Sequence, residues 1–234
     1  MIRRLFRTLG VLMVAAGLAM VAWFAWQYWG TNVVAQQKQQ EILADWTKTD
    51  AIGVLRVPRF GDDYEVPIIP GGDLVGPVGR EALTRGVASY ELGAEPGEVG
   101  NFVVSGHRVT HGEPFRDFPK LRAGDEVRVE TREAEYTYVL RNGGTEVIVP
   151  FTVSWPLKPV PDPDQPDAEA TEPLMTLVTC SELFHTDNRS VVIAELESAD
   201  RGEPGPRTSR PPRGGFVGWL VGLIQGIIDF VQGS

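Results

Sequence analysis

A long apolar run near the N-terminus is the most prominent hydrophobic feature of the chain. No charged residue occurs from Thr8 to Gln37, and the densest apolar stretch extends from Leu9 to Trp29. A helix of this length rises about 30 Å, which matches the hydrocarbon core of a bilayer. The pattern therefore predicts a transmembrane helix over residues 9–29.

The two flanks of this run predict its orientation. Arg3, Arg4 and Arg7 precede it. Aromatic residues, which favour the membrane interface, crowd its other end: Trp23, Phe24, Trp26, Tyr28 and Trp29. The positive-inside rule then places residues 1–8 in the cytoplasm and the rest outside, as a single-pass protein of the cell membrane. The alternative is a signal peptide cleaved after residues 33–35, although its apolar region would exceed the usual length. Both alternatives make the folded part extracytoplasmic.

In the remaining chain, the pattern of hydrophobic and polar residues changes at about residue 51. Residues 30–50 are polar with scattered Ile42, Leu43 and Trp46, which predicts a short helix or stalk that lifts the domain off the membrane. Short β-type runs bounded by Gly, Pro, Asp or Asn then follow one another, a pattern typical of an all-β barrel or sandwich over residues 51–198. The expected strands are Ile52–Val57, Val66–Ile69, Asn101–Val104, Glu126–Glu130, Tyr136–Leu140, Glu146–Val149, Leu174–Cys180 and Ser190–Leu196.

Two segments rich in proline interrupt or follow this pattern. Prolines recur between Phe151 and Pro173, where they exclude a central strand and predict a long surface loop. Because this loop leads into the strand that ends at Cys180, we expect it to border a site there. Residues 199–215 form a Pro/Gly/Arg-rich linker, and residues 216–234 are an apolar segment suited to an interfacial or helix-pairing role.

Composition narrows the functional classes. The chain of 234 residues has 22 Lys and Arg against 31 Asp and Glu, a formal net charge of −9, which argues against a nucleic-acid partner. Its one cysteine, Cys180, excludes an intrachain disulfide and a Cys-rich zinc module.

Reactive side chains lie at the ends of predicted strands, where rigid scaffolds present catalytic groups. His107 follows one strand in the sequence Ser-Gly-His-Arg, and Cys180 ends another. A free thiol has a pKa near 8.5, so a nucleophilic cysteine needs an imidazole or a cation nearby. If the last two predicted strands are neighbours, Arg189 returns to the same barrel end as Cys180. Its guanidinium could then stabilise an oxyanion.

Less reactive interpretations stay open at this point. A lone cysteine is often a small buried hydrophobe, and a histidine after Ser-Gly is often a turn residue. A zinc enzyme is a further alternative, with a ligand set of Cys180, His107, His111 and His185. A chelator would abolish the activity of a zinc enzyme and leave a cysteine enzyme active.

Three motifs together resemble the sortases, the membrane-anchored cysteine transpeptidases of Gram-positive bacteria, over about residues 51–196. The motifs are Ser105-Gly106-His107-Arg108 with the following Pro114-Phe115 and Leu121-Arg122-Ala123-Gly124-Asp125, then Thr176-Leu177-Val178-Thr179-Cys180, then Arg189. The spacing is most similar to the actinobacterial class E group. That group commonly has a tyrosine where this chain has His111, and His-Pro after the cysteine where this chain has Ser181-Glu182.

The resemblance implies an eight-stranded closed β-barrel with short helices and no cofactor or metal. It implies cleavage of the Thr-Gly bond in a sorting signal of the Leu-Pro-x-Thr-Gly (LPxTG) or Leu-Ala-x-Thr-Gly (LAxTG) type. Cys180 would be the nucleophile, His107 the acid and base, and Arg189 the oxyanion partner. The implied substrate-binding residues are Thr179, His111, Ser105 and Arg108, and His111 would tune substrate choice.

The implied partners are exported proteins with such signals, membrane lipid, and an amine acceptor. The acceptor is a peptidoglycan precursor or, in a pilin-polymerising sortase, a pilin lysine. A non-catalytic, membrane-tethered binding module is the remaining alternative, and it would form no acyl-enzyme with a sorting peptide.

Overall fold

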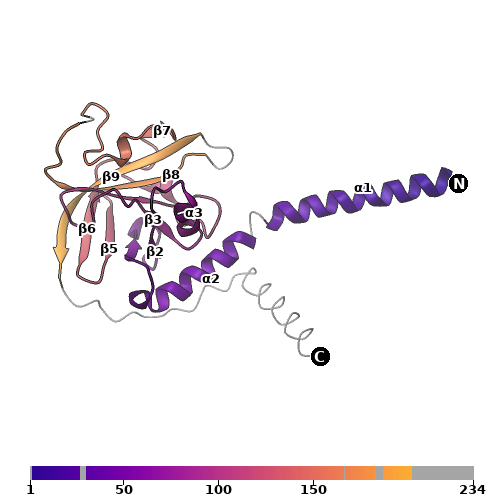
Figure 1. Cartoon of the computed structure of the whole chain (residues 1–234), viewed down its shortest axis with the longest axis horizontal. Helices are drawn as coiled ribbons and strands as arrows, with labels where there is room; N and C mark the ends of the chain where they lie inside the picture. Colours follow the sequence, from indigo (N-terminus) through magenta and orange to yellow (C-terminus); the bar gives the residue numbers. More distant parts are fainter. Residues whose placement is uncertain (1, 27–29, 166, 183–186, 202–234) are drawn as a thin grey trace. The chain divides into compact units, whose positions relative to one another are not determined.

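The computed structural model describes residues 2–26, 30–165, 167–182 and 187–201 (Figure 1). Within these residues the chain forms an N-terminal helix, a second helix and a β-barrel with short helices between its strands. The predicted apolar segment at 216–234, and the linker from residue 202 onward, lie outside the described residues.

The N-terminal helix α1 spans Ile2–Ala25. Its stretch Phe6–Phe24 has a mean hydropathy of 1.7 and is long and apolar enough, by length and composition, to cross a membrane. This stretch overlaps the predicted span 9–29, whose last three residues lie outside the described part.

Among the described residues nine strands form one sheet, and eight of them close into a barrel. The order in the ring is β6-β5-β1-β2-β3-β4-β8-β9, and an additional pairing of β6 with β9 closes it. The ninth strand, β7, pairs with the first three residues of β9. The strands are β1 Gly53–Arg56, β2 Glu65–Pro70, β3 Val87–Ser89, β4 Gly100–Ser105, β5 Glu126–Glu130, β6 Glu135–Leu140, β7 Ile148–Pro150, β8 Pro173–Cys180 and β9 Asn188–Asp200. The predicted eight-stranded closed barrel is therefore confirmed.

One of the eight strands that form the closed barrel differs from those expected from the sequence. The expected strand Glu146–Val149 corresponds to β7, which lies outside the closed ring. Its place in the ring is taken by β3, which the sequence pattern did not indicate. The three residues of β3 are all buried, so no alternation of apolar and polar positions marks them.

The barrel interior is filled by apolar side chains from all around the ring. Phe102 and Val104 of β4 meet Met175 and Leu177 of β8 in one buried cluster. Phe115, from the segment after β4, packs into the same cluster with no exposed surface. The loop that follows β4 and contains His107 is thus anchored in the core at its far end.

Helices of 3 to 14 residues precede the barrel strands or connect them. They are α2 Thr31–Ala44, η2 Trp46–Lys48, η3 Pro58–Phe60, α3 Pro77–Leu83, η4 Phe118–Lys120 and η5 Trp155–Leu157. A proline lies at the first or second position of α3, η3, η4 and η5, where its missing N–H leaves no helical bond unmade.

The segment at 30–50, predicted as a short helix or stalk, is largely helical in α2 and η2, and it packs on the barrel. Ile42 and Trp46 join a second buried cluster that contains Val54 of β1 and Ile69 of β2. Trp46 is only 1% exposed. Burial of such a large aromatic side chain contributes on the order of 2–3 kcal/mol, enough to hold the helix against the strands.

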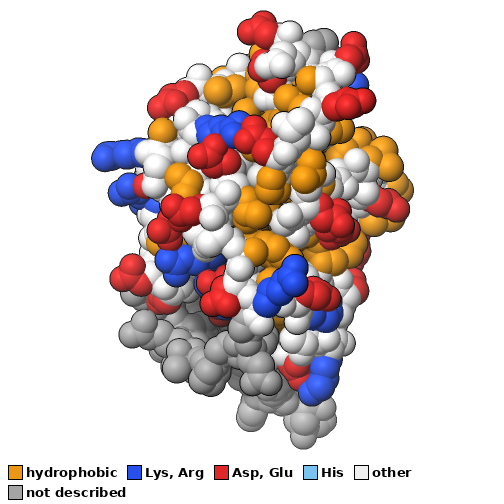
Figure 2. All heavy atoms as spheres, turned by 90° about the vertical axis from the view of Figure 1, so that its left-hand side faces the viewer, with side chains coloured by type: hydrophobic (Ala, Val, Ile, Leu, Met, Phe, Trp, Pro, Cys, Tyr) orange, Lys and Arg blue, Asp and Glu red, His pale blue; other side chains and the backbone are white. Residues whose placement is uncertain are grey.

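The barrel surface carries both signs of charge. On the face in Figure 2, acidic and basic side chains are interspersed among hydrophobic ones. Several opposite charges pair directly, as in Arg141 with Glu172 and Glu195, each at 2.8 Å. Mixed charge of this kind is typical of a solvated surface.

Candidate active site

The topology brings three chain segments to one end of the barrel. Strands β4 and β8 are parallel neighbours with Ser105 opposite Val178, so the residues that follow both strands emerge together. Strands β8 and β9 are antiparallel, and Cys180 is the direct cross-strand partner of Arg189. The neighbouring strands required to bring Arg189 beside Cys180 are therefore present.

Cys180 and Arg189 have well-defined surroundings. Cys180 is a partly buried free thiol at the last residue of β8. Arg189 donates from Nη1 to the carbonyl of Asn188 at 3.0 Å, and its Cζ lies 5.9 Å from the centroid of the Phe151 ring. The aromatic face orients the guanidinium at the mouth of β9.

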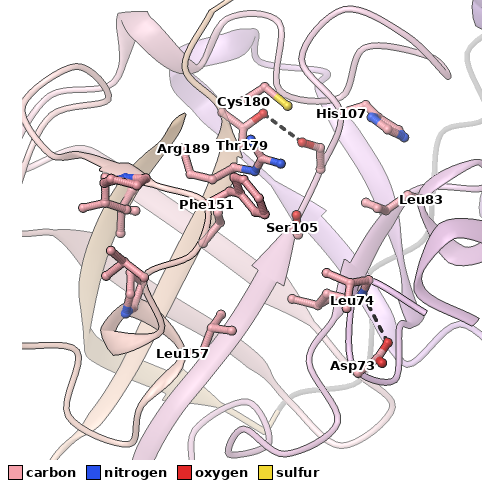
Figure 3. Close-up of a pocket in the computed structure, with 18 residues that line it drawn as sticks. Asp73, Leu74, Leu83, Ser105, His107, Phe151, Leu157, Thr179, Cys180 and Arg189 are labelled. Atoms are coloured by element: carbon pink, nitrogen blue, oxygen red, sulfur yellow. Dashed lines mark hydrogen bonds between the residues drawn. The ribbon is translucent and has the colours of Figure 1, made fainter. Parts of the chain in front are cut away.

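A pocket of about 200 Å³ lies beside these side chains (Figure 3). Cys180, His107 and Arg189 line it together. Its other walls are mainly apolar and come from β8, from the segment after β7, from the turn between β2 and α3, and from the end of α3. They include Val178, Phe151, Leu157, Leu74 and Leu83. A reactive thiol at one end of an apolar pocket could act on the end of an extended peptide.

The electrostatic environment of His107 disfavours its charged form. Burial, then the nearby His111, then the positive charge of Arg189 lower the pKa of His107 from its usual 6.5 to about 4. The imidazole is therefore neutral at pH 7. A neutral imidazole can accept a proton from a thiol and later return it to a leaving group.

His111 lies against His107 and not among the pocket-lining residues. The two imidazole rings stack with centroids 4.7 Å apart and an interplanar angle of 26°. Nδ1 of His111 is 3.1 Å from Oγ1 of Thr110. Partial burial lowers the pKa of His111 as well. Its proposed influence on substrate choice would thus act from beside the catalytic imidazole.

Of the other three expected substrate-binding residues, two line the pocket and one bonds to the backbone beside it. Ser105 and Thr179 line the pocket. The Thr179 hydroxyl, which is buried, donates to the carbonyl of Gly106 at 2.8 Å and so ties β8 to the residue before His107. Arg108 is not a pocket-lining residue, because its guanidinium donates to the backbone carbonyls of Cys180, at 3.5 Å, and Ser181.

The proline-rich loop borders the pocket only through its first part. Phe151, Val153, Pro156 and Leu157 line the pocket, whereas no described residue from Lys158 to Glu172 does. Asn101 of β4 fixes this part by donating from Nδ2 to the carbonyls of Pro156 and Lys158, at 2.9 and 2.8 Å. The expectation that the loop borders the site is thus met by its first part alone.

Sequence reasoning missed the wall formed by Asp73, Leu74 and Val75. The signal was the Gly71-Gly72-Asp73 sequence after a strand, followed by Pro77 at the start of α3. Asp73 Oδ1 accepts from the backbone N–H groups of Val75 at 3.2 Å and Gly76 at 2.6 Å, which stabilises the turn. This turn places Leu74 in the pocket wall.

The ligand set considered for zinc is not assembled among the described residues. Within that part of the chain no group of three or more His, Cys, Asp or Glu side chains could hold a metal ion. His185 lies outside the described residues.

Comparison with known proteins gives a consistent result. A family model described as the sortase domain matches residues 55–197. The chain is 30% identical over 216 residues to Sortase SrtE1 of Streptomyces coelicolor, a match that covers 85% of this chain and 60% of that protein. The chain thus spans 60% of the length of this relative.

Two solved structures are similar in fold and sequence. Sortase E from Streptomyces avermitilis is 34% identical with a TM-score of 0.56, covering 66% of this chain and 95% of that one. Sortase E1 from Streptomyces coelicolor, solved with a tripeptide in the active site, is 29% identical with a TM-score of 0.51. That match covers 66% of this chain and 94% of the other.

Proposed function

Because this chain belongs to the sortase family of cysteine transpeptidases, we propose that it cleaves sorting signals of the LPxTG or LAxTG type and transfers the protein to an amine. The observation that carries the proposal is the convergence of Cys180, His107 and Arg189 on one pocket. Strand register brings the cysteine and arginine together, and the parallel pairing of β4 with β8 adds the histidine.

In the first half-reaction, Sγ of Cys180 attacks the carbonyl carbon of the signal's threonine. The thiol proton passes to the imidazole of His107, which is neutral at pH 7 and therefore has a lone pair to accept it. The guanidinium of Arg189 stabilises the oxyanion of the tetrahedral intermediate. Collapse of that intermediate breaks the bond between Thr and Gly, and His107 returns its proton to the departing glycine amine.

In the second half-reaction, an amine attacks the thioester carbon. His107 takes the proton from the incoming amine, and Arg189 stabilises the second oxyanion. Collapse of this intermediate breaks the bond between carbon and sulfur, and protonated His107 returns its proton to the departing Cys180 thiolate. The acceptor is a peptidoglycan precursor or a pilin lysine. Both acceptors supply the primary amine that the chemistry requires.

The pocket walls suit the apolar residues that precede the threonine of a sorting signal. Leu74 and Leu157 line the pocket away from Cys180, as Figure 3 shows, and Leu83 lines it nearer His107. The solved sortase E1 of Streptomyces coelicolor holds a tripeptide in its active site. We place the apolar residues of an extended peptide in the corresponding pocket of this chain.

We further propose that the chain is a single-pass protein of the cell membrane. The helix α1 supplies the span, and the arginines in its first two turns favour a cytoplasmic N-terminus. The barrel then faces outward, where exported substrates and cell-wall precursors pass the membrane surface.

His111 is proposed to set the preference between the two signal types. A competition experiment measures the ratio of kcat/KM for LPxTG and LAxTG peptides with the wild type and with His111→Tyr. We expect the ratio to change by about threefold or more while turnover persists. Inactivity of the folded variant on both peptides would contradict a role of His111 limited to substrate choice.

Intact mass spectrometry tests the proposed reaction directly. The purified chain is incubated with a panel of sorting pentapeptides, and we expect a mass increase equal to the acyl fragment up to threonine. Cys180→Ala is the control and should show no adduct. Addition of an amine acceptor should release the adduct, and a chelator should leave it unaffected. Absence of any adduct across the panel would favour the non-catalytic binding module.

A further inference from the structure

Helix α2 buries two polar side chains on the face that packs against the barrel. Its buried positions are Asn32, Ala35, Gln39 and Ile42, which recur at three- and four-residue intervals along one side of the helix. Ile42 enters the apolar cluster, but Asn32 and Gln39 are only 8% and 9% exposed and need polar partners. Amide side chains on a helix surface are usually solvated, so this burial calls for an explanation.

Both amide side chains are bonded to the same short turn. Oδ1 of Asn32 accepts from the backbone N–H of Gly112 at 3.0 Å. Its Nδ2 donates to Oε1 of Glu113 and to the carbonyl of Val109 at 3.4 Å. Nε2 of Gln39 donates to the carbonyl of His111 at 3.3 Å. The bonded partners all belong to the segment directly after His107.

This turn has an unfavourable backbone conformation of its own. His111, Gly112 and Glu113 have consecutive positive φ angles of 53°, 87° and 53°. Left-handed conformations cost about 1 kcal/mol or more for each residue with a side chain. A Cβ at position 112 would also lie 2.6 Å from Nε2 of Gln39, so the glycine permits close approach of the helix. Contacts from outside the turn must therefore stabilise it.

The same turn carries a side chain to the catalytic imidazole. The ring of His111 stacks on the ring of His107 at a centroid distance of 4.7 Å. At the far end of the segment, the N–H of Phe115 donates to the carbonyl of His107 at 3.0 Å. The position of His107 is thus linked to the geometry of the turn from both sides.

We propose that Asn32 and Gln39 are positioning residues that hold His107 in place through the turn at 109–113, an arrangement we term the α2 clasp. The clasp acts through His111 and touches neither substrate nor reacting atoms. Its importance for turnover rests on the proposed function of His107. Only five residues separate the end of α1 from the start of α2, so the clasp connects the catalytic histidine to the segment next to the membrane helix.

Single substitutions in the detergent-solubilised full chain test the clasp. Asn32→Ala removes both bonding ends of the amide, and we expect kcat/KM for a sorting peptide to fall about tenfold. Gln39→Ala removes one donor and should lower kcat/KM about threefold. Gln40→Ala is the matched control, because Gln40 is exposed on the same helix and should leave kcat/KM unchanged.

An exchange of donor and acceptor tests whether the geometry of the clasp matters. Asn32→Asp keeps the acceptor for Gly112 but places a carboxylate against Glu113, so activity should fall. Adding Glu113→Gln supplies an amide that can donate to the new carboxylate, and the double variant should recover most of the activity. A double variant no better than Asn32→Asp would overturn the proposal.

A substrate-free measurement separates this proposal from the proposed function. NMR titration of the histidine rings in the full chain reports the pKa of His107, assigned with His→Gln variants. Neighbours that disfavour its protonation are His111 on the turn and Arg189 on β9. Asn32→Ala should raise the pKa of His107 towards its usual value by loosening the stack, and Gln40→Ala should not.

The outcomes are distinguishable. A shifted titration in an enzyme that forms no adduct with any sorting peptide would support the clasp and reject the proposed function. An unshifted titration in Asn32→Ala would overturn the clasp, whether or not activity is lost. Any loss of activity would then come from general destabilisation and not from a changed position of His107.

Discussion

The two halves of the candidate site are held by different kinds of structure. Cys180 and Arg189 lie in the regular ladder between β8 and β9, in which seven consecutive residue pairs keep register. His107 lies in a segment without regular structure, where three successive residues have positive φ angles. Side chains from Tyr64 and α2 support that segment.

We call Cys180 and Arg189 on β8 and β9 the strand half of the site, and His107 with the loop that follows it the loop half. The two halves should differ in the substitutions that they tolerate. A ladder of backbone bonds survives the loss of any one side chain, so substitutions in the strand half should act on chemistry alone. A turn held by a few side-chain bonds shifts when one is lost, so substitutions around the loop half should change the geometry of His107. Effects at a distance should therefore concentrate in the loop half.

The largest effect is expected for the nucleophile. Cys180→Ala should lower peptide turnover by at least about a thousandfold, because no other group in the pocket can form the thioester. The melting temperature should change little, since one sulfur at a strand end contributes little packing. Turnover is followed by chromatography of cleaved peptide and stability by thermal unfolding. Turnover near the wild-type rate would remove Cys180 from the mechanism.

Arg189 tests whether the strand half works through geometry or charge. Both Arg189→Lys and Arg189→Ala should lower kcat by about a hundredfold or more, because lysine keeps the charge and loses the planar set of N–H donors. Single-turnover acylation rates measure this effect. If lysine restores most of the rate, charge alone is sufficient at this position.

Acidification should destabilise the loop half through His107. Its pKa is near 6.5 in the unfolded chain and lowered to about 4 in the folded one, so between these values the unfolded state binds more protons. Stability is thus retained above about pH 6.5 and lost as the pH falls towards 4, by about 3 kcal/mol at pH 4 from this group alone. His107→Gln should lose less stability over that range in urea titrations. Equal losses would show that the buried imidazole does not contribute.

Two buried tyrosine hydroxyls give the smallest and most specific comparison. Tyr64 donates to the carbonyl of Pro114, in the loop half, at 2.6 Å, and the hydroxyl of Tyr138 accepts from the N–H of Gly97, away from the pocket, at 2.7 Å. Each Tyr→Phe change should cost about 1 kcal/mol of stability. Only Tyr64→Phe should also lower kcat, by about two- to fivefold. Equal effects on kcat would contradict the distinction between the halves.

The elements that sequence reasoning predicted are those whose information is local. The strands that end at Cys180 and begin near Arg189 show apolar residues bounded by turn-forming ones, and adjacent strands in sequence commonly pair. In an antiparallel pair, the last residue of one strand lies opposite the first residues of the next, which brings Cys180 beside Arg189. The same local signal put His107 at the end of a predicted strand, and the parallel pairing of β4 and β8 brings it to the same end of the barrel.

The parts that escaped prediction depend on partners distant in sequence. Asn32 and Gln39 read as ordinary polar residues of a helix, because nothing near them specifies a turn some 80 residues away. The stack of His111 on His107 likewise depends on the positive φ angles of the turn. The strand Val87–Ser89 is too short to show a period, and only its neighbours β2 and β4 define it.

The short connection between α1 and α2 limits the reach of the enzyme. The six backbone steps from Ala25 to Thr31 extend at most about 20 Å, and α2 is packed onto the barrel. In a membrane-anchored chain, the catalytic end therefore searches a thin layer along the bilayer and not the volume beyond it. Encounters with a substrate that is itself still tethered become a two-dimensional search, in which local density matters more than bulk concentration. Under the proposed topology, a substrate that has diffused away from the membrane would meet the catalytic end only on returning to that layer.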